Sequence, residues 1–173
     1  MIQGPAGSGK TLLSLGFLFN QLEKGRINKI IVFCNTVAAK DAAKLGFLPG
    51  DREEKLIDSQ IELEKLMENE TLVLLPMSDI RGYDTTGMRA GIYISEAQNL
   101  SIPLMKLALQ RIGNDSICII DGDEEAQVDD IAFAGINNGM RRASKVFRGH
   151  DIYGEITLTK IHRSRIAAIA EQM

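Results

Sequence analysis

The chain is predicted to form an α/β domain, with a mainly parallel β-sheet and helices on both of its faces. Short apolar segments typical of buried strands alternate with amphipathic segments typical of helices. A glycine-rich motif stands directly before the first helical segment. The composition, 45% hydrophobic and 25% charged over 173 residues, is that of an ordinary globular protein. One domain over residues 1–173 is therefore expected.

The individual elements follow from apolar runs and from helix signals. Strands are expected at the compact apolar runs, residues 29–34, 71–75, 91–94, 116–120 and 155–159. Helices are expected between and after them, at residues 12–25, 38–45, 52–69, 101–111, 131–142 and 162–173, with a polar loop at 78–89. Gly25 is typical of a helix C-terminus, and Ser101 followed by Pro103 is typical of a helix start. This alternation predicts that the strands run parallel.

Residues 4–11 match G-x-x-x-x-G-K-[ST], the phosphate-binding P-loop. Its glycines allow a tight curl in which backbone N–H groups point at a polyphosphate. Lys10 can reach the β- and γ-phosphate oxygens, the Thr11 hydroxyl can ligate Mg²⁺, and the dipole of the following helix favours an anion. A plain glycine-rich turn is the alternative, but four fixed positions rarely match by chance. The predicted nucleotide-binding residues are Gly4, Pro5, Ala6, Gly7, Ser8, Gly9, Lys10, Thr11 and Leu12.

A P-loop normally follows a buried strand, and only Met1, Ile2 and Gln3 stand before Gly4. Three residues are too few for a strand of about five or six. Without its central strand, an α/β domain would expose two long sheet edges. The first strand is therefore expected to be truncated, either because the chain is a fragment of a longer protein or because its start is placed too late.

Composition and charge narrow the functional classes. The net charge of −3 implies no bulk attraction to nucleic acid or to an anionic membrane, so any site for a polyanion must be a local patch. Trp is absent and aromatic residues are 5%, which argues against an extensive base-stacking platform. Cys34 and Cys118 are interpreted as small buried hydrophobes. Neither a signal peptide nor an apolar segment of membrane length is present, so a cytoplasmic location is expected.

Acidic residues stand at the ends of two predicted strands, where α/β folds bind ligands. Glu96 follows the third predicted strand and is placed to polarise an attacking water, with a surface glutamate as the alternative. Asp121 and Asp123 end the fourth predicted strand, in an acidic loop of a kind that is usually solvated. If the third and fourth strands are adjacent, Asp123 and Gln127 are candidates for coupling the γ-phosphate to motion.

These motifs together resemble the PhoH-like family of ATPases, which is related to superfamily-one helicase cores. The matching segments occur in order along nearly the whole chain: Gly4–Thr11, LGFLPGD at 45–51, Arg81-Gly82, EAQN at 96–99, Gly122-Asp123 with Gln127, and Arg163. The resemblance implies a RecA/helicase-like P-loop NTPase fold, ATP and Mg²⁺ as cofactors, and a phage-type member. It also implies that Arg163 reaches a γ-phosphate, in cis or from a neighbouring subunit; a helix-start cation is the alternative.

Three departures from the family pattern bear on activity. The family usually has Asp-Glu-Ala-Gln, whose Asp contacts Mg²⁺ through water, whereas this chain has Ser95 at that position. Because serine is neutral, both Mg²⁺ affinity and the rate of hydrolysis are in question. The spacing before Gln127 is one residue longer than usual, and Asn35 and Thr36 stand where an Arg is common.

The leading functional prediction is an Mg²⁺-dependent ATPase, with RNA and single-stranded DNA open as coupled polymers and a homo-oligomer as a possible assembly. Its predicted catalytic residues are Lys10, Glu96, Gln127 and Arg163, and its metal residues are Thr11 and Ser95. A small-molecule P-loop phosphotransferase and a non-catalytic nucleotide-dependent module are the alternatives. Four basic residues around Phe147 can follow a nucleic-acid backbone, although a solvated helix end explains them equally well: Arg141, Arg142, Lys145 and Arg148.

Overall fold

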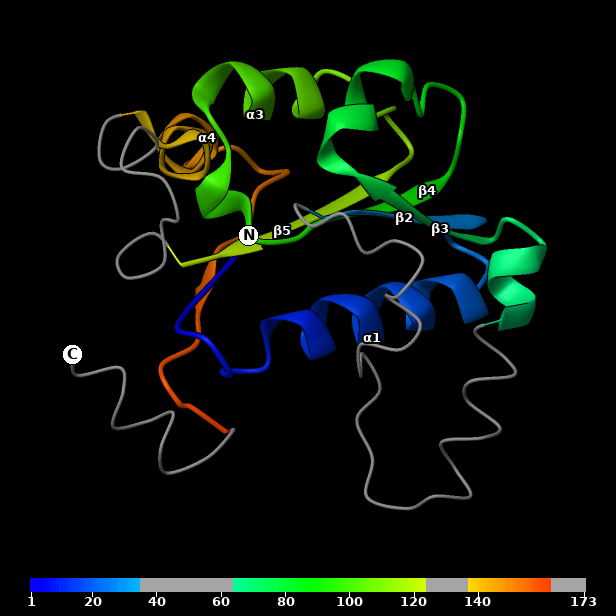
Figure 1. Cartoon of the computed structure of the whole chain (residues 1–173), viewed down its shortest axis with the longest axis horizontal. Helices are drawn as coiled ribbons and strands as arrows, with labels where there is room; N and C mark the ends of the chain where they lie inside the picture. Colours follow the sequence, from blue (N-terminus) through cyan, green and yellow to red (C-terminus); the bar gives the residue numbers. More distant parts are fainter. Residues whose placement is uncertain (35–63, 124–136, 163–173) are drawn as a thin grey trace.

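A six-stranded, all-parallel β-sheet forms the centre of the domain (Figure 1). The computed structural model describes residues 1–34, 64–123 and 137–162. The strand order is β3-β2-β4-β5-β1-β6. The strands are β1 (Ile2–Gln3), β2 (Lys29–Cys34), β3 (Leu72–Pro76), β4 (Ala90–Ile94), β5 (Ile117–Gly122) and β6 (Ile156–Thr157). The predicted α/β fold with a parallel sheet is confirmed.

Helices cover both faces of this sheet, as expected. Helix α1 (Lys10–Glu23) lies on one face, and α3 (Ile102–Leu109) and α4 (Gly139–Phe147) lie on the other (Figure 1). Two short 3-10 helices, η1 (Met77–Gly82) and η2 (Ala97–Asn99), follow β3 and β4. Within the described residues, no helix is both long enough and apolar enough to cross a membrane.

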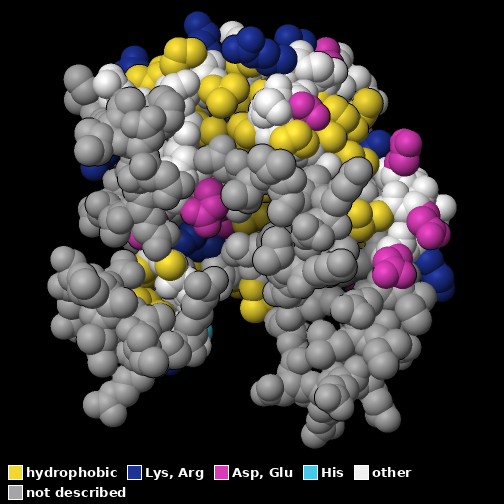
Figure 2. Space-filling model, viewed as in Figure 1, with side chains coloured by type: hydrophobic (Ala, Val, Ile, Leu, Met, Phe, Trp, Pro, Cys, Tyr) yellow, Lys and Arg dark blue, Asp and Glu magenta, His cyan; other side chains and the backbone are white. Residues whose placement is uncertain are grey.

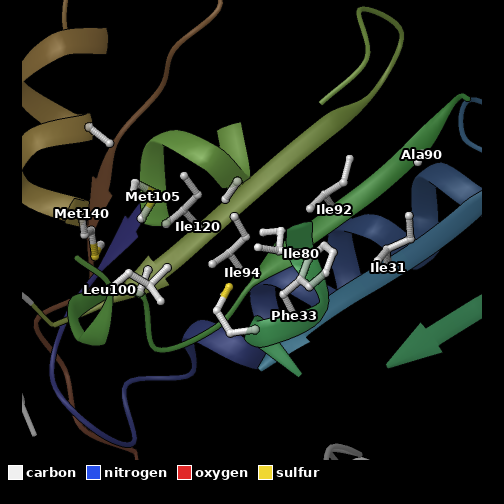
Figure 3. Packing of buried hydrophobic residues seen from close by; sticks show 14 residues of the cluster. Ile31, Phe33, Ile80, Ala90, Ile92, Ile94, Leu100, Met105, Ile120 and Met140 are labelled. Atoms are coloured by element: carbon white, nitrogen blue, oxygen red, sulfur yellow. The ribbon is translucent and has the colours of Figure 1, made fainter. Parts of the chain in front are cut away.

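Alternation along the strands divides the core into two hydrophobic clusters. Ile92 and Ile94 point to the α3 and α4 face, in the larger cluster of Figure 3. Tyr93, between them, points to the α1 face and packs with Leu18 and Ile30. Because side chains alternate across a strand, residues 95 and 121 continue on the α1 face. Polar residues at these two positions are therefore directed toward the start of α1.

Helix α1 is flanked by two glycines with positive φ angles, Gly9 before it and Gly25 after it. Gly9 is in the left-handed conformation, with φ of 92°, and ends the P-loop directly before Lys10. Gly25, with φ of 65°, follows the helix, and its N–H donates to the Leu22 carbonyl over 2.9 Å. This confirms Gly25 as a helix-terminating residue. No side chain caps the start of α1, so backbone N–H groups there are available for a ligand.

The residues before the P-loop do enter the sheet, although three residues are fewer than a strand usually needs. Ile2–Gln3 forms the two-residue strand β1 between β5 and β6. Hydrogen bonds to partners on both sides hold even this short segment, because each neighbour supplies backbone groups. Ile2 pairs with Asp121 and Gln3 pairs with Gly122, so β1 adjoins only the end of β5.

Other expectations are met unevenly. Ser101 caps α3 as predicted, its hydroxyl accepting from Leu104 N–H over 3.4 Å. The predicted helix at 131–142 is wrong in its start, because Asn138 has an extended backbone and caps a helix that begins at Gly139. The predicted loop at 78–89 contains most of η1. Of the predicted helix at 52–69, the structure describes a helical segment at 64–68. The predicted helix at 38–45 lies outside the described residues, as does the predicted helix at 162–173 except for His162, which is not helical.

Candidate nucleotide-binding site

The P-loop adopts a curl that only glycines tolerate at several positions. Gly4, Gly7 and Gly9 have φ angles of 150°, 76° and 92°. A Cβ at Gly4 would lie 2.4 Å from the Leu158 carbonyl oxygen, so this position also needs the absence of a side chain. The Gly7 carbonyl accepts from the His162 N–H over 2.9 Å. A backbone hydrogen bond from the segment that follows β6 thus holds the P-loop in place.

Lys10 and Ser8 mark the interior of this curl. The Lys10 side chain is buried, and its Nζ donates to the Gly4 carbonyl over 2.6 Å and to the Pro5 carbonyl over 3.0 Å. The Ser8 hydroxyl is the one buried side-chain polar atom without a hydrogen-bond partner within the described residues. An ammonium group and an unpaired buried hydroxyl beside a helix start suit an anionic ligand with several acceptor oxygens.

A hydrogen-bonded cluster on the same face joins α1 to the ends of β4 and β5. The Tyr93 hydroxyl lies 2.6 Å from Asp121 Oδ2, 3.2 Å from Thr11 Oγ1 and 3.4 Å from Ser95 Oγ. The register pairs Ile94 with Ile120, which makes Ser95 and Asp121 neighbours. Thr11, Ser95 and Asp121 thus all approach one atom, the Tyr93 hydroxyl oxygen. We name Lys10, Thr11, Tyr93, Ser95 and Asp121 the α1-side network.

Burial determines the electrostatics of this network. Burial raises the pKa of Asp121 to about 6, although hydrogen bonds from Tyr93 and from the Glu96 N–H oppose this shift. Burial, together with the Asp121 carboxylate, raises the pKa of Tyr93 as well. Tyr93 is therefore a neutral donor at physiological pH, and its short bond to Asp121 is charge-assisted when Asp121 is ionised. Figure 2 shows acidic and basic side chains in the recess between the grey segments, where β5 ends in Figure 1.

With this geometry in view, comparison with known proteins identifies the family. The family model described as PhoH-like protein matches residues 1–173. The chain belongs to the PhoH-like protein family. It is 34% identical to the "PhoH-like protein" of Bacillus subtilis, covering 97% of this chain and 54% of that protein. It is 32% identical to "Protein PhoH2" of Thermobispora bispora, covering 99% of this chain and 42% of that protein. The chain spans about half the length of these curated relatives.

A solved structure shares the fold. The Sulfolobus solfataricus SWI2/SNF2 ATPase core in complex with double-stranded DNA matches with a TM-score of 0.50 and 17% identity. The match covers 93% of the PhoH-like chain and 40% of the other chain. This likeness is one of fold, and it agrees with the helicase-like architecture expected from the motifs. Family and fold together make the chain a P-loop NTPase in its architecture.

Glu96 joins the α1-side network to a second network on the α4 side. It has φ of 54° directly after β4, and its exposed side chain accepts from Gln98 Nε2 over 2.6 Å. Its own N–H donates to Asp121 Oδ1 over 3.1 Å. Gln98 fixes the direction of the Glu96 carboxylate, and Asp121 fixes its backbone. The predicted placement of Glu96 at a strand end beside β5 is confirmed.

Gln98 is the centre of the second network, which is buried against α4. Gln98 Oε1 accepts from the Asp123 N–H over 3.2 Å, and its carbonyl accepts from Asn138 Nδ2 over 2.8 Å. A Cβ at Gly122 would lie 2.5 Å from Gln98 Oε1, so glycine is required for this close approach. We name Gln98, Asn138 and the Asp123 backbone the α4-side network. It holds the start of the Asp123 loop beside Glu96.

The residues near the start of α1 fit a hydrated magnesium ion. Thr11 and Ser95 offer hydroxyl oxygens, and Mg²⁺ in P-loop sites keeps several waters and takes further oxygens from the nucleotide phosphates. No group of three or more His, Cys, Asp or Glu suited to a metal occurs within residues 1–34, 64–123 and 137–162. The unpaired Ser8 hydroxyl and the Lys10 ammonium fit the phosphates that would complete such a site.

The structure brings most, but not all, of the predicted site together. Lys10, Thr11, Ser95 and Glu96 converge, whereas Gln127 and Arg163 lie outside the described residues. Tyr93 and Asp121 were not among the predicted site residues. In the sequence, Tyr93 belongs to an apolar strand, and Asp121 stands at the end of the fourth predicted strand, before an acidic loop of a kind that is usually solvated. The signal for Asp121 was its position one residue after the apolar run that ends at Ile120.

The basic cluster at α4 is only partly open to a polymer. Arg141, Arg142 and Lys145 are exposed on the helix surface. Arg148 pairs with Glu155, with 3.0 Å between Arg148 Nη2 and Glu155 Oε2. Arg148 therefore has a structural partner, which agrees with the alternative of a helix end for that residue.

Proposed function

We propose that this PhoH-like chain binds ATP and hydrolyses it in the presence of Mg²⁺. The observation that carries the proposal is the P-loop itself, directly before α1, in which the Lys10 ammonium is buried on loop carbonyls and the buried Ser8 hydroxyl has no hydrogen-bond partner among the described residues. Polar groups at the ends of β4 and β5 adjoin the same helix start. P-loop NTPases place the β- and γ-phosphates in such a curl.

Each residue has a defined proposed role. Lys10 leaves the Gly4 and Pro5 carbonyls and donates to β- and γ-phosphate oxygens, while the free N–H groups of α1 bind the remaining phosphate oxygens. Thr11 and Ser95 hold Mg²⁺, which when bound neutralises charge that develops on the phosphates. Glu96 orients the attacking water through its carboxylate, which Gln98 holds in place.

Two proposed roles rest on family resemblance. Gln127 senses the γ-phosphate, and Arg163 stabilises charge on it in cis or from a neighbouring subunit. An arginine of this kind is worth roughly 10³–10⁵ in rate in GTPases. Mixing Arg163→Ala with Lys10→Ala protein tests a shared site, because activity recovers only if one subunit completes the site of another.

We also propose that ATP turnover is coupled to nucleic acid, with RNA and single-stranded DNA as the first candidates. The exposed Arg141, Arg142 and Lys145 on α4 supply a local cationic surface despite the net negative charge. The structural neighbour is described in complex with double-stranded DNA, which makes the duplex a third polymer to test. Translocation by one core of this size would need oligomerisation or further sequence. The cytoplasm is the proposed location.

The decisive experiment measures ATP turnover by the full chain with Mg²⁺, alone and with RNA, single-stranded DNA or duplex DNA. Turnover that rises with a polymer supports the coupled ATPase. Transfer of the γ-phosphate to a small acceptor would instead identify a phosphotransferase. Nucleotide binding without turnover would identify a non-catalytic module, and no binding would remove the P-loop assignment.

A further inference from the structure

Residue 95 lacks the carboxylate that the PhoH-like pattern usually has there, and the neighbouring strand β5 carries one. Ser95 stands where the family usually has the Asp that contacts Mg²⁺ through water. The β4–β5 register places Asp121 beside Ser95, and both side chains are directed to the α1 face. The carboxylate that is absent from β4 is therefore present one strand away, on β5.

The surroundings of the buried Asp121 carboxylate favour a nearby cation. Asp121 is 1% exposed, and its oxygens accept from two neutral donors, the Tyr93 hydroxyl and the Glu96 N–H. A buried carboxylate is costly unless a positive charge compensates it. Lys10 acts on it through space, and in a nucleotide complex Lys10 is committed to the phosphates. A divalent ion beside Thr11 would then supply the balancing charge.

The geometry also leaves room for this role. Asp121 Oδ2 and Thr11 Oγ1 lie 2.6 Å and 3.2 Å from the same Tyr93 oxygen. A carboxylate offers about four lone-pair sites, and the two hydrogen bonds named above use two of them. The others remain for water molecules of a hydrated ion, which is how Mg²⁺ usually meets a single protein carboxylate.

We propose that Asp121 supplies the carboxylate that orients the hydrated Mg²⁺ of the nucleotide site, a charge that the neutral Ser95 hydroxyl cannot provide. The inference rests on the proposed nucleotide function of the P-loop. Tyr93 is a positioning residue, because it fixes Asp121 relative to Thr11 without itself contacting the nucleotide. The carboxylate of this site thus lies at the end of β5, beside Ser95 and on the same face of the sheet.

The test measures binding of Mn²⁺, used as a paramagnetic substitute for Mg²⁺, to the full chain with a non-hydrolysable ATP analogue. Electron paramagnetic resonance of free Mn²⁺ gives the affinity without relying on turnover. Asp121→Asn is expected to weaken Mn²⁺ binding roughly 10- to 100-fold, as is typical for loss of a group that orients a metal's ligands. Nucleotide affinity in metal-free buffer should be unchanged or higher, because the substitution removes a negative charge near the phosphates.

Two further variants separate a metal role from a structural one. Asp115→Asn is the matched control, because Asp115 is exposed at the opposite end of β5, and its Mn²⁺ affinity should equal that of the wild type. Ser95→Asp combined with Asp121→Asn returns one carboxylate to the site, and it should recover Mn²⁺ affinity to within about threefold of the wild type. A residue needed only for folding would give no such rescue.

The outcomes are distinct from failure of the proposed function. Equal Mn²⁺ affinity of Asp121→Asn and the wild type would overturn the inference while nucleotide binding stood. If Asp121→Asn does not fold, Asp121→Ser, whose neutral hydroxyl still offers an acceptor to Tyr93, replaces it, and Mn²⁺ affinity equal to that of the wild type then overturns the inference. Absence of nucleotide binding by the wild type, both with and without a divalent ion, would instead overturn the P-loop function itself.

Discussion

The α1-side and α4-side networks lie at the carboxyl ends of β4 and β5, on opposite faces of the sheet. They differ in how completely their buried polar groups are hydrogen-bonded to other groups of the protein. In the α4-side network, the buried Gln98 and Asn138 use side-chain donors and acceptors on other protein groups. In the α1-side network, the buried Asp121 carboxylate accepts hydrogen bonds from neutral donors. The Lys10 ammonium donates to two carbonyls of the P-loop.

This difference separates a scaffold from a site. A polar network whose members hydrogen-bond one another gains rigidity. A buried charge that has only neutral partners, or an ammonium that can exchange its carbonyl partners for phosphate oxygens, can instead bind a ligand. We therefore expect substitutions in the α1-side network to change ligand affinity more than stability, and substitutions in the α4-side network to do the reverse. Glu96 contacts both networks, so it tests their separation most directly.

Glu96→Gln is expected to have the largest effect, a loss of turnover of roughly 10²–10⁴ with ATP affinity kept, because the amide retains the shape but not the charge that orients water. Steady-state turnover and titration with a non-hydrolysable analogue measure the two quantities separately. Wild-type turnover in this variant would make Glu96 a surface residue.

Lys10→Ala should lower ATP affinity by about 100-fold, because it removes the main point charge facing the β- and γ-phosphates. Calorimetric titration measures the affinity, and the thermal midpoint reports stability. Lys24→Ala, an exposed lysine just after the other end of α1, is the matched control and should bind ATP as the wild type does. An unchanged affinity in Lys10→Ala would contradict the assignment of the α1-side network to a ligand.

Most of the sheet could be predicted because its information is local. The apolar runs of β2 and β4 predict buried strands, and the P-loop motif predicts where α1 begins. The position of Glu96 followed from these elements alone, since a residue after a parallel strand must lie at the carboxyl edge.

What the sequence did not predict depends on distant partners. Ile2–Gln3 is a strand because β5 and β6 pair with it from both sides. Asn138 begins α4 partly because it bonds Gln98, forty positions earlier. Asp121 can be buried because Tyr93 on β4 and the N–H of Glu96, which follows β4, donate hydrogen bonds to its carboxylate. A reading of single segments cannot foresee contacts of this kind.

Asn138→Ala should cost about 2–3 kcal/mol of unfolding free energy, because it removes the α4 cap and leaves the buried Gln98 carbonyl without this donor. Chemical denaturation measures the loss. Asn138→Ser keeps a capping hydroxyl and should lose about 1 kcal/mol less. ATP affinity should stay within about twofold of the wild type. A large loss of affinity without a loss of stability would show that the two networks act as one.

The smallest effect is expected at Glu155, which lies outside both networks and ties α4 and β1 to the β6 segment. Its carboxylate accepts from Gln3 Nε2 over 2.7 Å, from Ser144 Oγ over 2.9 Å and from Arg148 Nη2 over 3.0 Å. Glu155→Gln should lower the unfolding free energy at neutral pH by about 1 kcal/mol, since the side chain is partly exposed. ATP affinity should not change. Glu70→Gln, which breaks an exposed 3.9 Å pair with Lys29, is the matched control and should leave stability nearly unaltered.

The pH dependence of the Glu155→Gln effect has a definite sign. Burial alone would raise the pKa of Glu155, but hydrogen bonds from Tyr153, Arg148 and Ser144 outweigh burial and lower the pKa below its ordinary value of 4.5. A carboxyl whose pKa is lower in the folded state stabilises the fold above its unfolded-state pKa and loses that contribution as the pH falls through the folded-state value. The stability difference between wild type and Glu155→Gln should therefore be constant near pH 7 and shrink below about pH 4.5. Urea unfolding at a series of pH values measures it, and a difference that persists or grows on acidification would show that packing of Glu155, rather than its charge, holds α4 to the sheet.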